Sequence, residues 1–344
     1  MDAKIKDVAQ LAGVSISTVS NTLSGRKSVS PEKKAAVMDA VRQLGYVPNI
    51  NARLLKSRRT GNIGLFLPYV DGLFYTTLLQ EVYHACAENG YAMILHVDWD
   101  SESKNVAANI LSCNVDAAII LNDRLLDSEA ATLVKRSLPL VFMDRKLSLP
   151  GVGSIVLDNR MGTEQQVAYL AHTGHKRIAY LRGADNHDGK ERYEVFRQAM
   201  EAARLPVDET LVMDGQFVRK VAYNCVYYMM RSKRGNAPDA ILCANDEMAL
   251  GCIDALNDLG YSVPRDISVL GFDDMGADKS NPPLTTVNYS MRDFAHLAVE
   301  EAVRLIGNPQ AEGMSQNLKT ELRLRSSVAF RYKELPEAKN GVRG

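Results

Sequence analysis

The sequence predicts an α/β protein, in which a small all-α headpiece precedes two lobes of doubly wound parallel sheet. Three observations support this fold class. From residue 61 onward, short apolar runs alternate with helical stretches of roughly 10–15 residues, which is typical of parallel sheets covered by helices. These runs form two successive sets, which indicates two similar lobes with a cleft between them. The first 60 residues show helical patterns and carry 11 Lys and Arg against 4 Asp and Glu.

The headpiece begins with a predicted helix-turn-helix over residues 5–24. Apolar residues recur at helical spacing from Ile5 to Ala12, and Gly13 allows the tight turn that follows. Ser15 is placed to cap the second helix. The outer face of this second helix carries Ile16, Ser17, Ser20 and Asn21, a short mixed surface that suits base edges in a major groove.

Two further helices are expected before residue 61. Ser30 and Pro31 begin a helix whose core stripe consists of Val37, Val41 and Leu44, and Gly45 follows its end. Residues 48–56 then predict one more short helix, capped by Asn49. A helix this short is marginal in water, so it would need a partner to persist.

Charge supports a separate role for this N-terminal part. The whole chain carries 41 basic and 41 acidic residues, which leaves 30 basic and 37 acidic residues after position 60. A basic end on an acidic body is expected of a nucleic-acid-binding module attached to another domain.

The body follows the alternating pattern in order. The first predicted set of strands is 63–67, 92–97, 117–121 and 140–143, with helices over 76–89 and 103–113. The second set is 155–157, 178–181, 211–213, 240–243 and 267–270, with helices over 162–172, 193–203, 220–231 and 247–259.

Ligands of such sheets bind beyond the carboxyl ends of the strands. The residues found there are Phe74, Tyr75, Asp98, Asp144, Arg145, Arg192, Asn245, Asp246, Asp273 and Asp274. Aromatic faces together with carboxylate, amide and guanidinium groups suit a sugar, whose ring stacks and whose hydroxyls take directed hydrogen bonds. Other roles stay open for three of them: Asp246 as a helix cap, Asp274 as a turn or interlobe residue, and Phe74 as core.

Several function classes lack their signatures. The sequence contains no phosphate-binding loop and no nucleophile elbow, so we expect no enzyme and no cofactor. The histidines of 172–175 lie where a helix ends, which favours a structural role over a metal site. The five cysteines are odd in number and form no Cys-x-x-Cys pair, which is typical of a reducing compartment. No secretory signal and no long apolar span is present, so we expect a cytoplasmic protein without membrane contact.

The order of helix-turn-helix, third helix and hinge resembles the headpiece of the lac repressor / galactose repressor family of bacterial regulators. Residues 61–330 resemble the effector-binding core of that family, which shares its fold with periplasmic sugar-binding proteins. The resemblance implies a headpiece over 1–47, a hinge over 48–60 and a core over 61–344. The core would comprise an N-lobe (about 61–157 and 290–317) and a C-lobe (about 158–287 and 319–331), with crossings near Asp158, 287–289 and 318–319.

The resemblance also implies roles for individual residues. DNA contacts fall on Ile16, Ser17, Thr18 and Asn21 of the recognition helix and on Asn51, Arg53, Leu55 and Lys56 of the hinge. Leu55 would act as a wedge in the minor groove, where an apolar side chain between base steps kinks the operator. Effector contacts fall on Phe74, Tyr75, Asp144, Arg145, Arg192, Phe217, Asn245 and Asp273.

We therefore expect a transcriptional regulator, a repressor in its simplest form, that binds a palindromic operator as a homodimer and responds to a sugar. A purine or nucleoside effector stays open, as does the choice between induction and corepression. A solute-binding transport protein would not explain the basic headpiece, and an enzyme with a DNA-binding appendage lacks a catalytic constellation. The tail over 331–344 has no leucine heptad, so we expect no tetramerising coiled coil.

Overall fold

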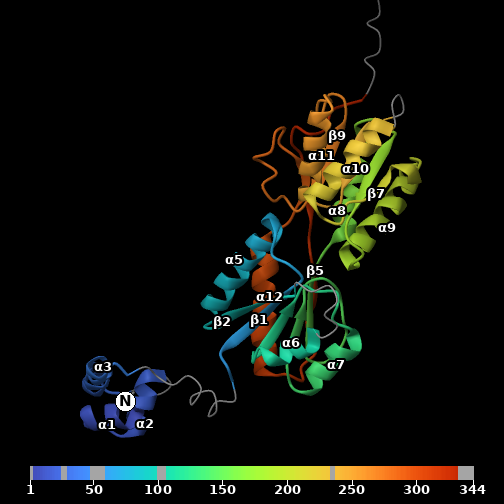
Figure 1. Cartoon of the computed structure of the whole chain (residues 1–344). Coiled ribbons are helices and arrows are strands. Elements are labelled where there is room, and N and C mark those ends of the chain that lie inside the picture. The colour runs from blue at the N-terminus through green and yellow to red at the C-terminus, as the bar shows by residue number, and fades with distance from the viewer. Residues whose placement is uncertain (1–2, 25–28, 47–58, 99–105, 233–236, 332–344) are drawn as a thin grey trace, which may run out of the picture. The chain divides into compact units, whose positions relative to one another are not determined.

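The computed structural model describes residues 3–24, 29–46, 59–98, 106–232 and 237–331. The chain divides into two compact units, Met1–Thr60 and Gly61–Gly344 (Figure 1). The predicted hinge helix over 48–56 lies outside the described residues. Each unit has its own hydrophobic core, and the two are described separately below.

The first unit is a bundle of three helices: α1 (Ile5–Leu11), α2 (Ile16–Ser24) and α3 (Pro31–Leu44). Its core is built around Val8, Val19 and Val37, which are fully buried. The expected turn is present, with Gly13 at a φ of 62°. The bundle therefore forms from the apolar positions that the helical spacing indicated.

Two details of α3 differ from the expectation. Leu44 is 37% exposed, whereas Ala40 is buried and Val41 packs against the core. Ser30 occupies the N-cap position, but its side chain makes no capping hydrogen bond. Gly45 ends the helix at a φ of 58°, as expected.

The first lobe of the second unit is a six-stranded parallel sheet, in the order β11-β5-β4-β3-β1-β2. Its strands are β1 (Asn62–Leu67), β2 (Ala92–Val97), β3 (Ala117–Ile120), β4 (Leu140–Phe142), β5 (Val152–Leu157) and β11 (Ser315–Leu318). Its helices are α5 (Gly72–Glu88), α6 (Val106–Ser112), α7 (Asp127–Lys135) and α12 (Met291–Gly307). Along β3, Ala117 and Ile119 join one core while Ala118 and Ile120 join the other, so helices cover both faces.

The second lobe repeats this plan with the order β12-β10-β9-β8-β6-β7. Its strands are β6 (Ile178–Arg182), β7 (Val212–Asp214), β8 (Ala240–Cys243), β9 (Ser268–Phe272), β10 (Thr285–Asn288) and β12 (Glu321–Arg323). Its helices are α8 (Asn159–His172), α9 (His187–Ala202), the short η1 (Glu209–Leu211), α10 (Arg219–Ser232) and α11 (Asp246–Asp258). β12 runs antiparallel to β10, and the other neighbours are parallel.

The chain passes between the lobes three times. It leaves the first lobe after β5 through Asp158, returns after β10 through Tyr289, and crosses again between β11 and β12. The first and third crossings are tied together, because Asp158 N–H donates to Leu318 O at 2.9 Å and Thr320 Oγ1 donates to Asp158 O at 2.9 Å. Two of the three segments that connect the lobes are thus hydrogen-bonded to each other.

The assignment of residues 155–157 to the second set of strands is wrong. These residues belong to β5, which pairs with β4 and β11 in the first sheet. The expected set also omitted α7 and the strands β10, β11 and β12. α5 and α9 begin at Gly72 and His187, four and six residues before their predicted starts.

The fold class itself is confirmed: a small helical headpiece and two lobes of doubly wound parallel sheet. All five cysteines are free, with the Sγ atoms of buried Cys243 and Cys252 3.4 Å apart. Over the part of the chain that the structure describes, no helix is both long and apolar enough to cross a bilayer.

Candidate functional site

The second helix of the headpiece, α2, presents a solvent-facing surface. Ile16 is 52% exposed and Ser17 is also exposed, whereas Val19 faces the core. Ser15 holds the start of the helix, since its Oγ accepts a hydrogen bond from Thr18 N–H at 3.2 Å. This is the predicted cap. Thr18 and Asn21 are partly buried beside the exposed face.

Lysines surround this bundle. Lys4, Lys6, Lys33 and Lys34 are all exposed on α1, α3 or their starts. An exposed polar helix within a basic bundle suits a DNA duplex, because cations meet the phosphates while short side chains reach base edges. The predicted hinge contacts Asn51, Arg53, Leu55 and Lys56 lie outside the described residues.

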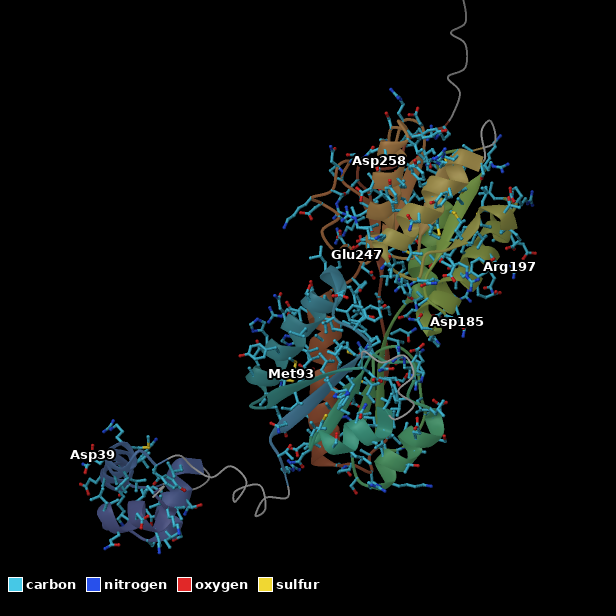
Figure 2. The ribbon with its side chains drawn as sticks, viewed as in Figure 1. Asp39, Met93, Asp185, Arg197, Glu247 and Asp258 are labelled. Carbon is cyan, nitrogen blue, oxygen red and sulfur yellow. The ribbon has the colours of Figure 1, made fainter. Side chains whose placement is uncertain are left out.

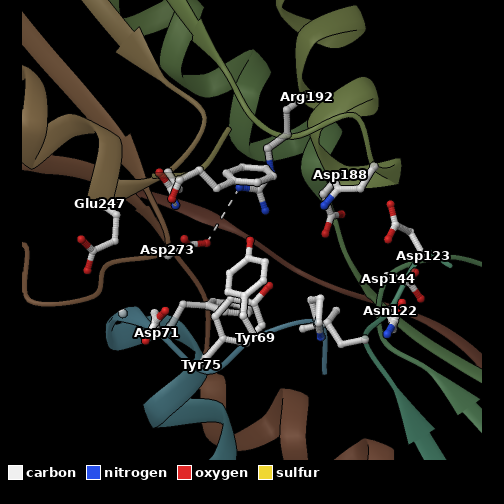
Figure 3. Close-up of a pocket in the computed structure, with 17 residues that line it drawn as sticks. Tyr69, Asp71, Tyr75, Asn122, Asp123, Asp144, Asp188, Arg192, Glu247 and Asp273 are labelled. Carbon is white, nitrogen blue, oxygen red and sulfur yellow. Dashed lines mark hydrogen bonds and ion pairs between the residues drawn. The ribbon is translucent and has the colours of Figure 1, made fainter. Parts of the chain in front are cut away.

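A pocket lies between the two lobes of the second unit, at the carboxyl ends of their strands. It encloses about 740 Å³, part of it open to solvent. Figure 3 shows Tyr69, Asp71 and Tyr75 of the first lobe facing Arg192 and Asp188 of the second. Its walls are Pro68, Tyr69, Asp71, Gly72, Phe74, Tyr75, Leu121, Asn122, Asp123, Asp144, Asn186, Asp188, Arg192, Phe217, Asn245, Glu247 and Asp273.

The lobes approach closely at this pocket. Glu247, at the start of α11, lies at the end of the second lobe that faces the first (Figure 2), and a Cβ added at Gly72 of α5 would lie 3.5 Å from its Oε1. Likewise, a Cβ added at Gly276 would lie 2.9 Å from Leu73 Cδ1. A ligand in the pocket would therefore contact both lobes at once.

Arg192 and Asp273 form the centre of the second-lobe wall. Both are buried, and Arg192 Nη1 lies 3.9 Å from Asp273 Oδ1 (Figure 3). Arg192 is fixed in place by hydrogen bonds to Asn159 Oδ1 and Ala244 O, at 2.8 and 2.6 Å, and its guanidinium lies 3.7 Å above the Phe272 ring. Burial raises the pKa of Asp273 to about 7, against the lowering effect of Arg192.

Backbone strain marks the same wall. Asp273 has a φ of 114° and Phe217 a φ of 61°, values that side-chain-bearing residues rarely adopt. Such strain concentrates at binding sites, where the surrounding structure has to maintain it. Gly183 admits the Phe217 ring, because a Cβ there would lie only 2.1 Å from Phe217 Cζ.

Asp144 supplies the corresponding acid from the first lobe. One carboxylate oxygen, Oδ2, accepts a hydrogen bond from Arg145 Nη1 at 2.8 Å. The other, Oδ1, is buried and has no hydrogen-bond partner among the described residues. Burial raises the pKa of Asp144 to about 6, with Arg145 opposing the rise and Asp188 adding to it. Arg145 itself does not line the pocket; it also donates to Leu125 O and lies 4.4 Å above the Phe142 ring.

Aromatic rings form the floor on the first-lobe side. The Tyr69 and Tyr75 rings lie 4.7 Å apart, and the Phe74 and Tyr75 rings 5.0 Å apart. Burial, followed by the effect of Tyr69, raises the pKa of Tyr75 well above its ordinary value. Phe74 and Tyr75 therefore line the pocket while packing against the first-lobe core.

Comparison with known proteins decides the family. Residues 4–49 match the family of bacterial regulatory proteins called the lacI family, and residues 167–328 match the periplasmic binding protein-like domain. The repressor PurR of Haemophilus influenzae (strain PittEE) is 32% identical over 337 residues, which are 95% of this chain and 98% of that protein. The chain belongs to the lacI family.

Solved structures agree with this lacI-family assignment. The lac repressor dimer bound to operator and the anti-inducer ONPF aligns with a TM-score of 0.82 at 25% identity, covering 96% of this chain and 100% of that one. The complex of the regulator CelR with cellobiose aligns with a TM-score of 0.69 at 30% identity, covering 94% and 99%. The predicted function class, a DNA-binding transcriptional regulator, is confirmed, and PurR and the lac repressor, which this chain resembles, are repressors.

The pocket of this lacI-family protein contains residues that the strand-end rule should have included. Asn122 and Asp123 follow the strand at 117–120 after one residue, and reading that strand's end would have found them. Asn186 and Asp188 lie in the loop and first helical turn after β6. The sequence analysis named Arg192, farther along the same helix, but not these two residues.

Four other residues named beyond the strand ends make structural contacts, and only Asn245 of these also lines the pocket. Asn245, not Asp246, caps α11, because its Oδ1 accepts Met248 N–H at 3.0 Å. Asp246 is buried behind the pocket wall and accepts from Thr286 Oγ1 and Met275 N–H at 2.5 and 2.8 Å. Asp274 pairs with Arg325 at 2.7 Å. Asp98, which we listed beyond the second strand, does not line the pocket and lies 3.9 Å from Arg124.

The histidines at the end of α8 are not part of any metal-ligand cluster among the described residues. His175 is buried and exchanges a hydrogen bond with Ser268 Oγ at 2.8 Å and another with Thr173 Oγ1 at 2.9 Å. His187, Asp188 and Glu191 do lie close together, with their ligand atoms within 4.8 Å of one another. Asp188 and Glu191 already accept from Asn159 Nδ2, which explains that cluster.

Proposed function

We propose that this lacI-family chain is a repressor that binds a palindromic operator as a homodimer. Two observations support this. The relatives that resemble it over nearly their whole length are repressors, and the lac repressor structure that it resembles is a dimer on its operator. One helix-turn-helix per chain also needs a two-fold partner to match a palindromic site. Since its target is DNA, the protein acts in the cytoplasm.

The two parts of the headpiece contribute differently to operator binding. Ile16, Ser17, Thr18 and Asn21 on α2 meet base edges, and the exposed lysines meet phosphates, which supply most of the affinity. By the family resemblance, Asn51, Arg53, Leu55 and Lys56 contact the operator centre. Leu55 there is the apolar wedge.

A sugar or sugar derivative in the interlobe pocket controls this repressor. The observation that carries the proposal is the convergence of both lobes on one pocket that contains Arg192, Asp273 and Asp144 beside aromatic rings. The contact residues are Phe74, Tyr75, Asp144, Arg192, Phe217, Asn245 and Asp273. Arg145 acts through Asp144, whose Oδ2 it binds, rather than on the ligand.

The site is linked to the crossings between the lobes. Tyr289, on the second crossing, donates its hydroxyl to Asp273 Oδ1 at 3.2 Å. A ligand that contacts both lobes favours one interlobe arrangement over others, and the crossings carry the change. Effector and operator binding are then coupled reciprocally.

A nucleoside or purine base is the second candidate. The rings of Phe74, Tyr75 and Phe217 all line the pocket, and aromatic faces stack on a base as well as on a sugar. An observation against a nucleoside or purine is that most of the other polar side chains in the pocket wall are hydrogen-bond acceptors. Acceptors suit a ligand with many hydroxyl donors.

The test begins with binding-site selection by the full-length protein, which yields an operator. Thermal shift with sugars and nucleosides then finds stabilising compounds, and anisotropy measures their effect on operator affinity. We expect a sugar-type compound to stabilise the protein and to change operator affinity. Selection of no consensus, or compounds that stabilise without altering operator binding, would contradict the proposal.

A further inference from the structure

The interlobe pocket has an excess of negative charge. Among the described residues that line it, the acids are Asp71, Asp123, Asp144, Asp188, Glu247 and Asp273. Of the wall residues that the structure describes, Arg192 is the single basic one. Both lobes contribute acids, so closing the lobes on a ligand brings like charges toward one another.

The protein itself compensates little of this charge. Asp144 pairs with Arg145 at 2.8 Å, and Asp273 lies 3.9 Å from Arg192. Within the described ranges, no Lys, Arg or His nitrogen lies within 4 Å of the carboxylates of the other four acids. Asp188 accepts a hydrogen bond at 2.7 Å, but its donor is the neutral amide of Asn159.

Arg192 offsets only part of the charge of the pocket. Its Nε and Nη1 donate to Asn159 Oδ1 and Ala244 O, and its plane lies against Phe272. An anionic ligand such as a sugar phosphate would meet one occupied guanidinium and six acids. An anionic ligand is therefore disfavoured at this site.

One carboxylate oxygen lacks a donor. Asp144 is 7% exposed, and its buried Oδ1 has no partner among the described residues, although the residue lines the pocket. A buried carboxylate oxygen without a hydrogen bond is costly, so a donor from the ligand has a large effect at this position. Asp188 interacts unfavourably with both Asp144 and Asp273, and it raises the pKa of each.

We propose that the effector carries a protonated amine, and that this ammonium group donates to Asp144 Oδ1 beside Asp188. This proposal rests on the proposed function, because it names the chemical class of the same effector. The ligand class is an amino sugar or a similar polyhydroxylated amine. Its hydroxyls take the remaining acceptors, and its ring lies on the aromatic floor.

The alternatives in the same pocket lack one of these features. A neutral hexose supplies donors but leaves the charge of the acids uncompensated. A hydrogen bond from a charged donor to a carboxylate is shorter and about twice as strong as one from a neutral donor. The amine thus gains most where the site is most acidic.

The experiment compares matched ligands on the full-length protein at pH 7, with EDTA present so that divalent cations do not compete. The pairs are glucosamine with glucose, galactosamine with galactose and mannosamine with mannose, and each N-acetyl derivative keeps the size while removing the charge. Calorimetry gives the affinities. We expect at least one amino hexose to bind about tenfold or more tightly than its parent and its N-acetyl derivative.

Variants locate the effect. Asp144→Asn and Asp188→Asn should each remove most of the amine preference, measured as the ratio of the amino-hexose affinity to the parent-hexose affinity of the same variant. Asp258→Asn, an exposed position at the far end of α11 (Figure 2), is the matched control and should keep it. Because Asp188 is only partly buried, its variant decides the question should Asp144→Asn fail to fold.

The outcomes separate this proposal from the function on which it rests. If neutral hexoses or nucleosides bind as well as every amino hexose, or if the preference persists in both variants, the amine proposal is wrong and the regulator function stands. If no amino hexose binds at all, the amine proposal is equally wrong. If no compound of any class binds the pocket, the effector function itself fails.

Discussion

Arg192 shows how a buried cation becomes part of a binding surface. Its guanidinium is largely shielded from solvent, because Asn159, Ala244 and Phe272 occupy most of its surroundings. It fixes the position of Asp273 electrostatically, and Tyr289 does so by a hydrogen bond. The acceptor that a ligand meets is thus rigid before binding, which lowers the entropy cost of association.

Removing either partner should silence the effector response. Arg192→Ala and Asp273→Ala are each expected to abolish the change in operator affinity on effector addition, while operator affinity without effector stays nearly intact. Arg197→Ala, on the same helix but 53% exposed, serves as the control. Calorimetry and operator anisotropy report the two quantities. Wild-type effector affinity in either pocket variant would refute that residue's assignment.

The raised pKa values predict how stability depends on pH. In the folded chain Asp273 and Asp144 have pKa values of about 7 and about 6, above the ordinary 3.8, so the folded state binds more protons. Their stabilising contribution is present below about pH 4 and is lost as pH rises through 6–7. Three charged side chains also influence the pKa of Asp273: Arg192 lowers it, and Asp188 and Glu247 raise it.

Asp273→Asn removes one such contribution. The stability of the variant relative to wild type should therefore increase as pH rises from 5 to 8, by on the order of a few kcal/mol. Only the wild type loses the contribution of Asp273 over this range. Denaturant melts at a series of pH values check this. Parallel curves for the two proteins would show that the pKa of Asp273 is the same in the folded and unfolded states.

At this scale the sequence locates about half of the pocket wall. Reading beyond strand ends led to Phe74, Tyr75, Asp144, Asn245 and Asp273, because parallel strands bring their carboxyl ends to one edge. It misplaced Arg145, since a sequence does not show which way a side chain turns. Asp188 needed knowledge of how the loop after β6 folds back.

Among the elements, α2 carries the operator preference. Ser17 is exposed and Asn21 lies beside the exposed face, so substitution of these two residues alters contacts without disturbing the core around Val19. Changing Ser17 and Asn21 to other polar residues should change the preferred bases by about 1–3 kcal/mol per base pair. Binding-site selection on the double variant measures this. An unchanged consensus sequence would show that α2 does not recognise the operator bases.

The loop after β6 offers a test of the aromatic wall. Gly183→Ala places a methyl group 2.1 Å from Phe217 Cζ, so the ring has to move and the pocket wall with it. We expect weaker effector binding with operator affinity unchanged. Gly307→Ala is the matched control, because nothing lies within 4 Å of its new methyl group. Equal effector affinities in the two variants would mean that Phe217 does not contact the ligand.

Most elements of the sheets were predictable from apolar runs, and the exceptions have physical reasons. β11 and β12 are short and polar at edge positions, with residues such as Ser315 and Glu321 exposed, so they lack an apolar signature. Residues 155–157 read correctly as a strand. Periodicity does not say which sheet a strand joins, and no helix separates β4 from β5 to suggest it.

For the whole molecule, the division at residue 60 makes a prediction about coupling. The proposed effector and operator sites lie in different units, and we expect the coupling between them to require bound DNA. A chain beginning at Gly61 should bind effector within about twofold of the full-length affinity measured without DNA. It should bind no operator. A large loss of effector affinity would show that the headpiece contributes to the pocket directly.

The three crossings have a consequence for synthesis of the chain. The first lobe depends on α12 and β11, both of which are translated only after the entire first stretch of the second lobe. When synthesis has reached only Phe272, the first lobe still lacks α12 and β11, so the apolar face that these elements cover is exposed. Exposed apolar surface on an incomplete chain attracts aggregation and chaperones. Stop codons late in the reading frame should thus yield insoluble protein, although the headpiece and most strands are already made.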